Sequence, residues 1–342
     1  MEIEKLTVKE WVDEEYYYLY NKVLEAISNN SRIHIKAPLG RGKTVTMVRM
    51  IEDLYNFNQI LVLEPQIAIT NTVHQYLALK NIPAFRFNGE DRDKLTKADL
   101  TYPIISTIDS GYIILDPEFE HHIDLNRTII FFDETHACLT EGKLAYDKTL
   151  RAIEKAGCPI IGFSATPVGW VTRHLLRFEE EIDISVTDAK KKEVIPMKIS
   201  HGIPSTLAYL ITSDDLKKVV IFTTNIKDQE RIKNEIESIS KKECLVLNRP
   251  SRLDDNKKEW NQLMNSGYLP KETEVLLMNK VAQAGINIKD KDIDAVFMVG
   301  KFDPVGFVQY LGRCRNYNEP YYYMYYKYGK QTTFWQGSDK HE

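Results

Sequence analysis

The stretch IKAPLGRGKT, residues 35–44, joins the end of an apolar run to a glycine-rich turn and a Lys–Thr pair. It matches the phosphate-binding pattern G-x-x-x-x-G-K-[ST] except at its first position, where this chain has Ala37. The residues that follow, 44–56, have the apolar spacing of a helix. A strand that turns into a helix through such a loop predicts an α/β fold with a polyphosphate site.

Each residue of this loop suits a polyphosphate ligand. Gly40 and Gly42, which flank Arg41, let the backbone approach phosphate oxygens without a Cβ in the way. Lys43 supplies a positive charge for the β and γ phosphates, and Thr44 supplies a hydroxyl for Mg²⁺. The unpaired N–H groups at the start of the next helix point toward the same ligand.

A second motif, RTIIFFDETHA at residues 127–137, strengthens this interpretation. Its apolar residues predict a buried strand, and two acids follow at the carboxyl end, the edge where open α/β sheets bind ligands. Asp133 is placed to hold Mg²⁺, and Glu134 is placed to polarise an attacking water. A surface turn that happens to be acidic is the alternative.

Apolar, β-prone runs recur along the chain and are nearly continuous rather than alternating, as in strands that are covered on both faces. Helix-like segments lie between them, which predicts mostly parallel sheets with helices on both faces. The predicted strands cover residues 32–37, 59–65, 102–107, 127–134, 158–166, 218–224, 243–248, 273–279 and 293–300, and the predicted helices cover 44–56, 68–80, 143–156, 226–240 and 305–311.

A charge-dense stretch at residues 177–200 interrupts this rhythm and predicts a boundary between two domains, 1–190 and 191–342. The alternative is a single continuous sheet with a long surface excursion. Two tyrosine-rich runs are interpreted structurally, residues 14–20 as a helix face and 321–328 as a terminal strand. Stacking on bases of a single strand is the functional alternative for both.

Composition restricts the function classes. The formal net charge of −4 argues against a protein that coats nucleic acid through its overall positive field, but a narrow cationic track remains compatible. The sequence has no signal peptide and no apolar stretch of about 18–20 residues, so we expect a cytoplasmic protein without a membrane partner. The four cysteines form no C-x-x-C pair, which predicts reduced thiols rather than a zinc site; they are Cys138, Cys158, Cys244 and Cys314.

Taken together, the motifs resemble those of superfamily 2 helicases, in the expected order over roughly residues 30–320. The loop is similar to their A-x-x-G-x-G-K-T form, which explains Ala37, and D-E-T-H is similar to the D-E-x-H form of their second motif. Further similar stretches are VLEPQIAITN (62–71), ISTIDS (105–110), FSATP (163–167), VVIFTTN (219–225), VLLMNKVAQAGINI (275–288) and QYLGRCRN (309–316).

The resemblance implies two RecA-like domains with ATP and Mg²⁺ between them and a nucleic-acid strand across both. It implies an ATP-hydrolysing helicase or translocase, with DNA favoured over RNA. The implied catalytic residues are Lys43, Asp133, Glu134, Arg313 and Arg315; the nucleotide-binding residues are Gly40, Arg41, Gly42, Lys43, Thr44, Gly285, Asn287 and Gln309; the metal-binding residues are Thr44 and Asp133; the coupling residues are His136, Ser164 and Thr166; the nucleic-acid contacts are Pro65, Gln66, Thr107, Thr223 and Asn279.

Three asparagines depart from the family pattern. Asn316 stands where the family usually has its last arginine, and we expect the nearer Arg315 to substitute for it, as in some viral and origin-associated relatives. An origin in a virus or mobile element is therefore one expectation. Asn279 replaces a usual threonine and Asn287 a usual aspartate.

These departures motivate an alternative function, a nucleic-acid-binding subunit that uses ATP only as a conformational switch. A small-molecule kinase would leave the ordered motifs of the second half without a purpose. No glutamine-based adenine motif precedes Ala37, which disfavours a DEAD-box RNA helicase and leaves the base preference open.

Overall fold

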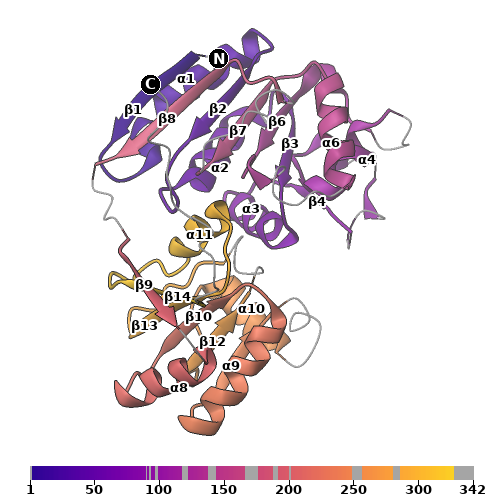
Figure 1. Cartoon of the computed structure of the whole chain (residues 1–342). Helices are drawn as coiled ribbons and strands as arrows, with labels where there is room; N and C mark the ends of the chain where they lie inside the picture. Colours follow the sequence, from indigo (N-terminus) through magenta and orange to yellow (C-terminus); the bar gives the residue numbers. More distant parts are fainter. Residues whose placement is uncertain are drawn as a thin grey trace. The chain divides into compact units, whose positions relative to one another are not determined.

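The computed structural model divides the chain into two compact units, Met1–Lys191 and Lys192–Glu342 (Figure 1). Each unit is described by itself. The residues that the structure describes are 2–89, 91, 94–96, 99–117, 122–137, 144–165, 176–187, 192–199, 202–248, 256–279 and 286–326.

The first unit is built on a parallel sheet. Its eight described strands follow the order β1-β8-β2-β7-β6-β3-β5-β4. The strands are β1 (Glu2–Val8), β2 (Arg32–Lys36), β3 (Gln59–Glu64), β4 (Phe85–Phe87), β5 (Ile104–Thr107), β6 (Thr128–Phe132), β7 (Ile160–Ser164) and β8 (Glu180–Val186), and the helices are α1 (Tyr16–Ser28), α2 (Lys43–Leu54), α3 (Ile67–Leu79), α4 (Ile108–Leu115) and α6 (Leu144–Lys155).

Strands in the middle of this sheet are apolar on both faces. Leu63 and Phe132 belong to one buried cluster with Tyr146 and Leu150 of α6. Val62, which alternates with Leu63 and so faces the other way, is also fully buried. Helices therefore cover both faces, and the edge at the carboxyl ends of the strands is where loops can bind a ligand.

The second unit repeats this design with six described strands in the order β11-β12-β10-β13-β14-β9. Alternate residues of the strand Val219–Thr223 face opposite sides of this sheet. Val220 and Phe222 pack in a cluster with Trp260, whereas Val219 and Ile221 pack in another cluster with Leu207. The strands are β9 (Val194–Ile199), β10 (Val219–Thr223), β11 (Cys244–Leu247), β12 (Val275–Met278), β13 (Ala295–Val299) and β14 (Tyr321–Tyr326), and the helices are α8 (Ile203–Ser213), α9 (Ile226–Ile239), α10 (Lys257–Ser266) and α11 (Pro304–Leu311).

The predicted fold class is confirmed, since every strand pairing in the described part of both sheets is parallel. All the strands and helices predicted above are present, although their ends differ by a few residues. The tyrosines of the first run lie on α1, and residues 321–326 of the second run form β14, as the structural interpretation predicted, while residues 327 and 328 lie outside the described residues. None of the described helices is long and apolar enough to cross a bilayer.

The interpretation of residues 177–200 as an interruption of the strand pattern was wrong, because this stretch contains β8 and β9. Carboxylates mask β8 in the sequence, but two of them are paired in the sheet. Glu181 lies 3.0 Å from His34 and Asp183 lies 2.8 Å from Lys36, both across to β2. Pairing offsets much of the cost of placing these charges in a strand.

Candidate nucleotide and nucleic-acid sites

The predicted phosphate-binding loop lies between β2 and α2, so its position between a strand and a helix is as predicted. Gly40 and Gly42 have φ of 72° and 87°, the left-handed region that glycine adopts without steric cost. Lys43 is buried at the start of α2, and its ammonium donates hydrogen bonds of 3.1 Å to the carbonyl of Ala37 and 3.2 Å to that of Pro38. The loop thus wraps around a cation, and its backbone faces the start of a helix of 12 residues.

Segments distant in the sequence hold this loop in place. The N–H of Ala37 donates to the carbonyl of Ser164 at 3.0 Å, which ties the loop to the end of β7. The N–H of Val12 donates to the carbonyl of Arg41 at 2.9 Å. A Cβ built on Gly42 would lie 3.7 Å from the ring of Trp11, so the segment before α1 packs on the loop.

The predicted acidic pair lies in the turn after β6. The Asp133 N–H donates to the carbonyl of Leu63 at 3.0 Å, and the Asp133 carboxylate accepts from the N–H of Glu134 at 2.8 Å. Glu134 has φ of 48°, an uncommon conformation for a residue with a side chain. Since β6 is separated from β2 only by β7, the acidic turn and the phosphate loop leave the same edge of the sheet one strand apart.

Burial and nearby carboxylates raise the pKa values of two acids here, Asp133 and Glu64. Burial raises the pKa of Asp133 above its ordinary value, Glu134 raises it further, and Lys43 opposes both. Burial also raises the pKa of Glu64, at the end of β3, well above its ordinary value, with added contributions from Asp133 and Glu134. Among the described residues, neither carboxyl oxygen of Glu64 has a hydrogen-bond partner.

These residues fit a Mg²⁺ ion that is bound together with a nucleotide. The described residues contain no group of three His, Cys, Asp or Glu side chains that could hold a metal ion alone. Mg²⁺ commonly takes one or two protein oxygens and completes its shell with substrate phosphates and water. Thr44, half-buried at the start of α2, and Asp133 offer such oxygens next to a loop suited to phosphate.

Two of the three predicted coupling residues lie in the described part of this site. His136 is buried, with its Nδ1 atom 3.2 Å from Oε2 of Glu134. Ser164 is fully buried at the end of β7 and bonds the phosphate loop through its carbonyl. Thr166 lies outside the described residues.

The predicted strand contacts of the first unit occupy the same edge, further along the sheet. Pro65 follows β3, and its carbonyl accepts a hydrogen bond of 2.9 Å from the Tyr146 hydroxyl. Gln66 precedes α3 directly, in extended conformation. Thr107 precedes α4, and its hydroxyl donates to that of Ser110 at 3.1 Å. Adjacent strands β3 and β5 therefore present these residues side by side.

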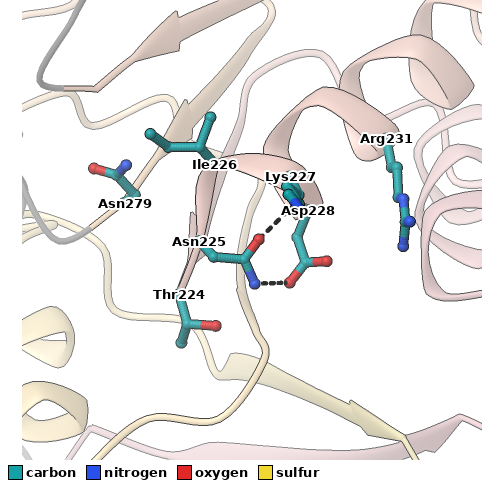
Figure 2. A pocket seen from close by; sticks show the side chains of 7 residues that line it. All are labelled: Thr224, Asn225, Ile226, Lys227, Asp228, Arg231 and Asn279. Carbon is teal, nitrogen blue, oxygen red and sulfur yellow. Dashed lines mark hydrogen bonds between the residues drawn. The ribbon is translucent and has the colours of Figure 1, made fainter.

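In the second unit, a pocket of about 550 Å³ opens where β10 and β12 end (Figure 2). Thr223 is fully buried at the end of β10, directly before Thr224 of the pocket, and Asn279 lines the pocket from the end of β12. The N-terminus of α9 forms another wall, where the Asn225 side chain accepts a hydrogen bond of 2.8 Å from the N–H of Asp228. The lining residues are Thr224, Asn225, Ile226, Lys227, Asp228, Arg231 and Asn279.

The last predicted motif forms a hydrogen-bonded group after α11. The buried Arg313 donates to Oε1 of Gln309 at 2.6 Å, and the exposed Arg315 donates to Oδ1 of Asn287 at 2.7 Å. A parallel bridge between Ile288 and Cys314 joins the two segments. The structure thus brings together the predicted residues Asn287, Gln309, Arg313 and Arg315 of the second unit. Gly285 lies outside the described residues.

Sequence reasoning missed several residues of these sites. Glu64 was read as part of an apolar strand, and Trp11 was not connected with the loop. His34 and Glu181 were hidden inside β-prone or charged runs. Glu64, His34 and Glu181 acquire their neighbours through the strand order, and Trp11 acquires its neighbour through the packing of the segment before α1 on the loop. A lone acid at the end of an apolar strand could have marked Glu64.

Two parallel sheets with helices define an α/β protein, and the fold matches that of the two RecA-like domains of superfamily 2 helicases. Residues 12–169 match the family model of the type III restriction enzyme res subunit. A search of curated proteins found no significant match.

Solved structures show the likeness in fold. The DEAH/RHA helicase HrpB of Escherichia coli has a TM-score of 0.60 and 17% identity over 90% of this chain, which spans 42% of that one. Dbp5 of S. cerevisiae, bound to RNA and ADP BeF3, has a TM-score of 0.67 and 14% identity, with 93% of this chain and 87% of that chain covered. The DUF1998 helicase MrfA, bound to DNA, has a TM-score of 0.66 and 14% identity, with 95% and 52% covered.

Proposed function

We propose that this chain is the ATPase core of a nucleic-acid motor, a helicase or translocase that couples ATP hydrolysis to movement along DNA or to its remodelling. The observation that carries the proposal is the convergence of Lys43, Asp133 and Glu134 at one sheet edge. Lys43 lies in the loop after β2, whose backbone suits phosphates, and the two acids lie in the turn after β6. Only β7 separates these two strands in the sheet.

In this proposal the loop binds ATP through the backbone of residues 40–44 and the ammonium of Lys43. Mg²⁺, held by Thr44 and Asp133, would neutralise charge on the phosphates. Glu134 orients the attacking water and accepts its proton. Arg313 and Arg315, from the second unit, stabilise the charge that develops on the transferred phosphoryl group, while Gly285, Asn287 and Gln309 complete the nucleotide site.

The nucleic-acid part of the proposal rests on contacts that suit a phosphate backbone rather than base edges. The proposed contacts, which all lie at or directly after strand ends, are Pro65, Gln66 and Thr107 on the first unit and Thr223 and Asn279 on the second. Gln66 is half-buried and the other four are buried. His136, Ser164 and Thr166 couple this surface to the ATP site in the proposed cycle. We propose DNA as the nucleic acid on the description of the family model as a restriction-enzyme subunit, while the similar solved structures include both a DNA-bound and an RNA-bound helicase.

The pocket at α9 adds a cationic wall to this track. Lys227 and Arg231 line it, and the N-terminus of a helix of 14 residues favours an anion there. We expect the double variant Lys227→Ala/Arg231→Ala to bind single-stranded DNA more weakly and with a shallower salt dependence, measured by fluorescence anisotropy from about 50 to 200 mM salt.

Lys233→Ala is the matched control on the same helix, because Lys233 lies outside the pocket in a partly exposed pair with Glu237. An unchanged salt slope in the double variant would count against a nucleic-acid site at this pocket.

ATP turnover tests the motor itself. Phosphate release should rise several-fold when single- or double-stranded DNA is added, and the same panel with RNA measures the preference. Lys43→Ala should abolish turnover by removing the phosphate cation, and Glu134→Gln should abolish turnover while retaining ATP binding. Normal hydrolysis by Glu134→Gln would show that another group activates the water.

The second candidate, a subunit switched by ATP with little turnover, is favoured by one observation. Arg313 and Arg315 are both hydrogen-bonded within their own unit, to Gln309 and Asn287. Turnover decides between the two functions, since a motor sustains hydrolysis over many cycles and a switch stops after one.

A further inference from the structure

A buried ionisable pair crosses from β8 to β2, outside the residues assigned to the sites above. His34 and Glu181 are register partners in these adjacent parallel strands. Nδ1 of His34 lies 3.0 Å from Oε2 of Glu181. The two side chains are 0% and 3% exposed, so the pair is shielded from water.

The other ring nitrogen of His34 reaches the acidic turn. Its Nε2 lies 3.2 Å from Oγ1 of Thr135, which is fully buried. The N–H of Thr135 in turn donates to the carbonyl of Phe163 at 3.1 Å. Thr135 is therefore held both by the end of β7 and by the pair from β2 and β8.

The histidine ring can reach this far because β7 has a glycine in its path. Gly162 is the register partner of His34, and a Cβ there would lie 2.5 Å from the Phe178 ring and 3.1 Å from Cδ2 of His34. The Phe178 ring packs beside the imidazole with centroids 5.2 Å apart. Glycine thus leaves the slot through which the ring spans from β2 to the turn after β6.

Thr135 directly follows Glu134, the proposed base, so the contact between His34 and Thr135 bears on how Glu134 is held. Glu134 has φ of 48°, a conformation that is strained for a residue with a side chain and persists only when its surroundings enforce it. On one side the Asp133 carboxylate accepts from the Glu134 N–H at 2.8 Å. On the other side, Thr135 is anchored by His34 and the Phe163 carbonyl.

We propose that Glu181 and His34 are positioning residues that act through Thr135 to keep Glu134 oriented for water activation. The Glu181 carboxylate accepts the hydrogen of Nδ1, which leaves Nε2 to accept the Thr135 hydroxyl hydrogen. The proposal rests on the proposed ATPase function. The alternative is that the His34–Glu181 pair only stabilises the sheet and does not affect ATP hydrolysis.

Positioning of Glu134 and stabilisation of the sheet can be distinguished by measuring kcat and stability separately. Apolar replacement of a buried pair is often neutral for stability, so a loss of kcat without a loss of stability indicates positioning. Thr135→Val keeps the shape of the side chain and removes its hydroxyl. We expect it to lower kcat for ATP roughly ten- to hundredfold, with KM changed less than about twofold, because the base is misplaced while nucleotide contacts remain. Thr135→Ser retains a hydroxyl and should restore most of the activity.

A double-variant cycle then tests the path through His34. His34→Leu should lower kcat as Thr135→Val does, and the double variant should be no slower than the slower single variant. The matched control is Asp183→Asn, which breaks the Lys36 pair of 2.8 Å in the same two strands and should leave kcat unchanged. Wild-type kcat in Thr135→Val, or multiplying effects in the double variant, would overturn the proposal.

A readout on the wild-type chain remains informative if a variant fails to fold. In nitrogen-15 NMR of labelled histidines, the His34 signal, assigned in the wild-type chain by through-bond correlation to its own backbone, should report a protonated Nδ1. A neutral ring protonated at Nε2 instead would overturn the proposal. Absence of any ATP turnover in the wild type would refute the proposed function, and the NMR result would still decide whether the hydrogen-bonded chain exists.

Discussion

Glu64 buries a carboxyl group at the end of β3, where both its oxygens lack a partner among the described residues. Its raised pKa means that the folded state holds the proton more tightly than the unfolded chain does. The stability from this proton is fully present below the ordinary carboxyl pKa of 4.5 and is lost as the pH rises through the raised value.

Glutamine in the variant Glu64→Gln does not ionise, so this variant should not lose stability as the pH rises. Without nucleotide or Mg²⁺, we expect the variant to be more stable than the wild type by about 1–3 kcal/mol at pH 8, with a smaller difference near pH 4.5. Urea denaturation at the two pH values measures the effect, and the exposed Glu230→Gln serves as the control. A difference that is the same at both pH values would contradict this account.

Gly162 is constrained by close packing rather than by its backbone angle. A Cβ would lie 2.5 Å from the Phe178 ring, which is itself buried, so Gly162→Ala should destabilise the chain by about 1–3 kcal/mol. Gly89→Ala is the control, because a Cβ there meets nothing within 4 Å. Chemical denaturation of both variants checks the prediction, and equal midpoints would mean that the ring moves aside without cost.

At the scale of elements, the sites arise because parallel strands bring their carboxyl ends to one edge. The carboxyl ends of β2, β7 and β6 come from three distant parts of the chain, yet these strands are consecutive in the sheet. In the proposed function, different positions along this edge have different roles. The proposed nucleotide-binding loop and the acids Asp133 and Glu134 lie toward β2, and the proposed strand contacts lie toward β5.

Helix α9 begins with an asparagine cap that also shapes the pocket. The Asn225 side chain accepts a hydrogen bond of 2.8 Å from the N–H of Asp228. Asn225→Ala should therefore lower the free energy of unfolding by about 1 kcal/mol, whereas Asn225→Ser, which retains a capping oxygen, should lower it much less. Thermal and urea unfolding measure both variants, and equal losses would show that capping is not the cause.

At the scale of the whole molecule, each unit has its own hydrophobic core. One described cluster joins α4 and α6 to the first sheet, and two others cover the faces of the second. We expect residues 1–191 produced alone to unfold cooperatively and to bind ATP, because Lys43 and the acids are all present.

The same fragment should show no nucleic-acid stimulation of turnover, since Arg313 and Arg315 are lacking. Calorimetry, nucleotide titration and phosphate release test these three statements, with Lys43→Ala in the fragment as the control for binding. Stimulated turnover by the fragment would remove the arginines from the proposed mechanism.

Sequence patterns were sufficient for most elements because the inner strands are apolar on both faces and the helices keep their apolar spacing. Lys43, Thr44, Asp133 and Glu134 were predictable because each belongs to a short motif whose chemistry depends on local spacing. Strand β8 was not predictable, since its carboxylates read as a solvated run until pairing with β2 is known.

The sequence by itself determined the fold class, the phosphate loop and the acidic turn, because these depend on residues that are neighbours in the chain. Only the tertiary structure decided that Glu64 is buried beside the acids, that Gly162 opens a slot, and that His34 joins Glu181 to Thr135. The physical reason is strand order: hydrogen bonding between strands, which no local pattern encodes, sets which side chains become neighbours.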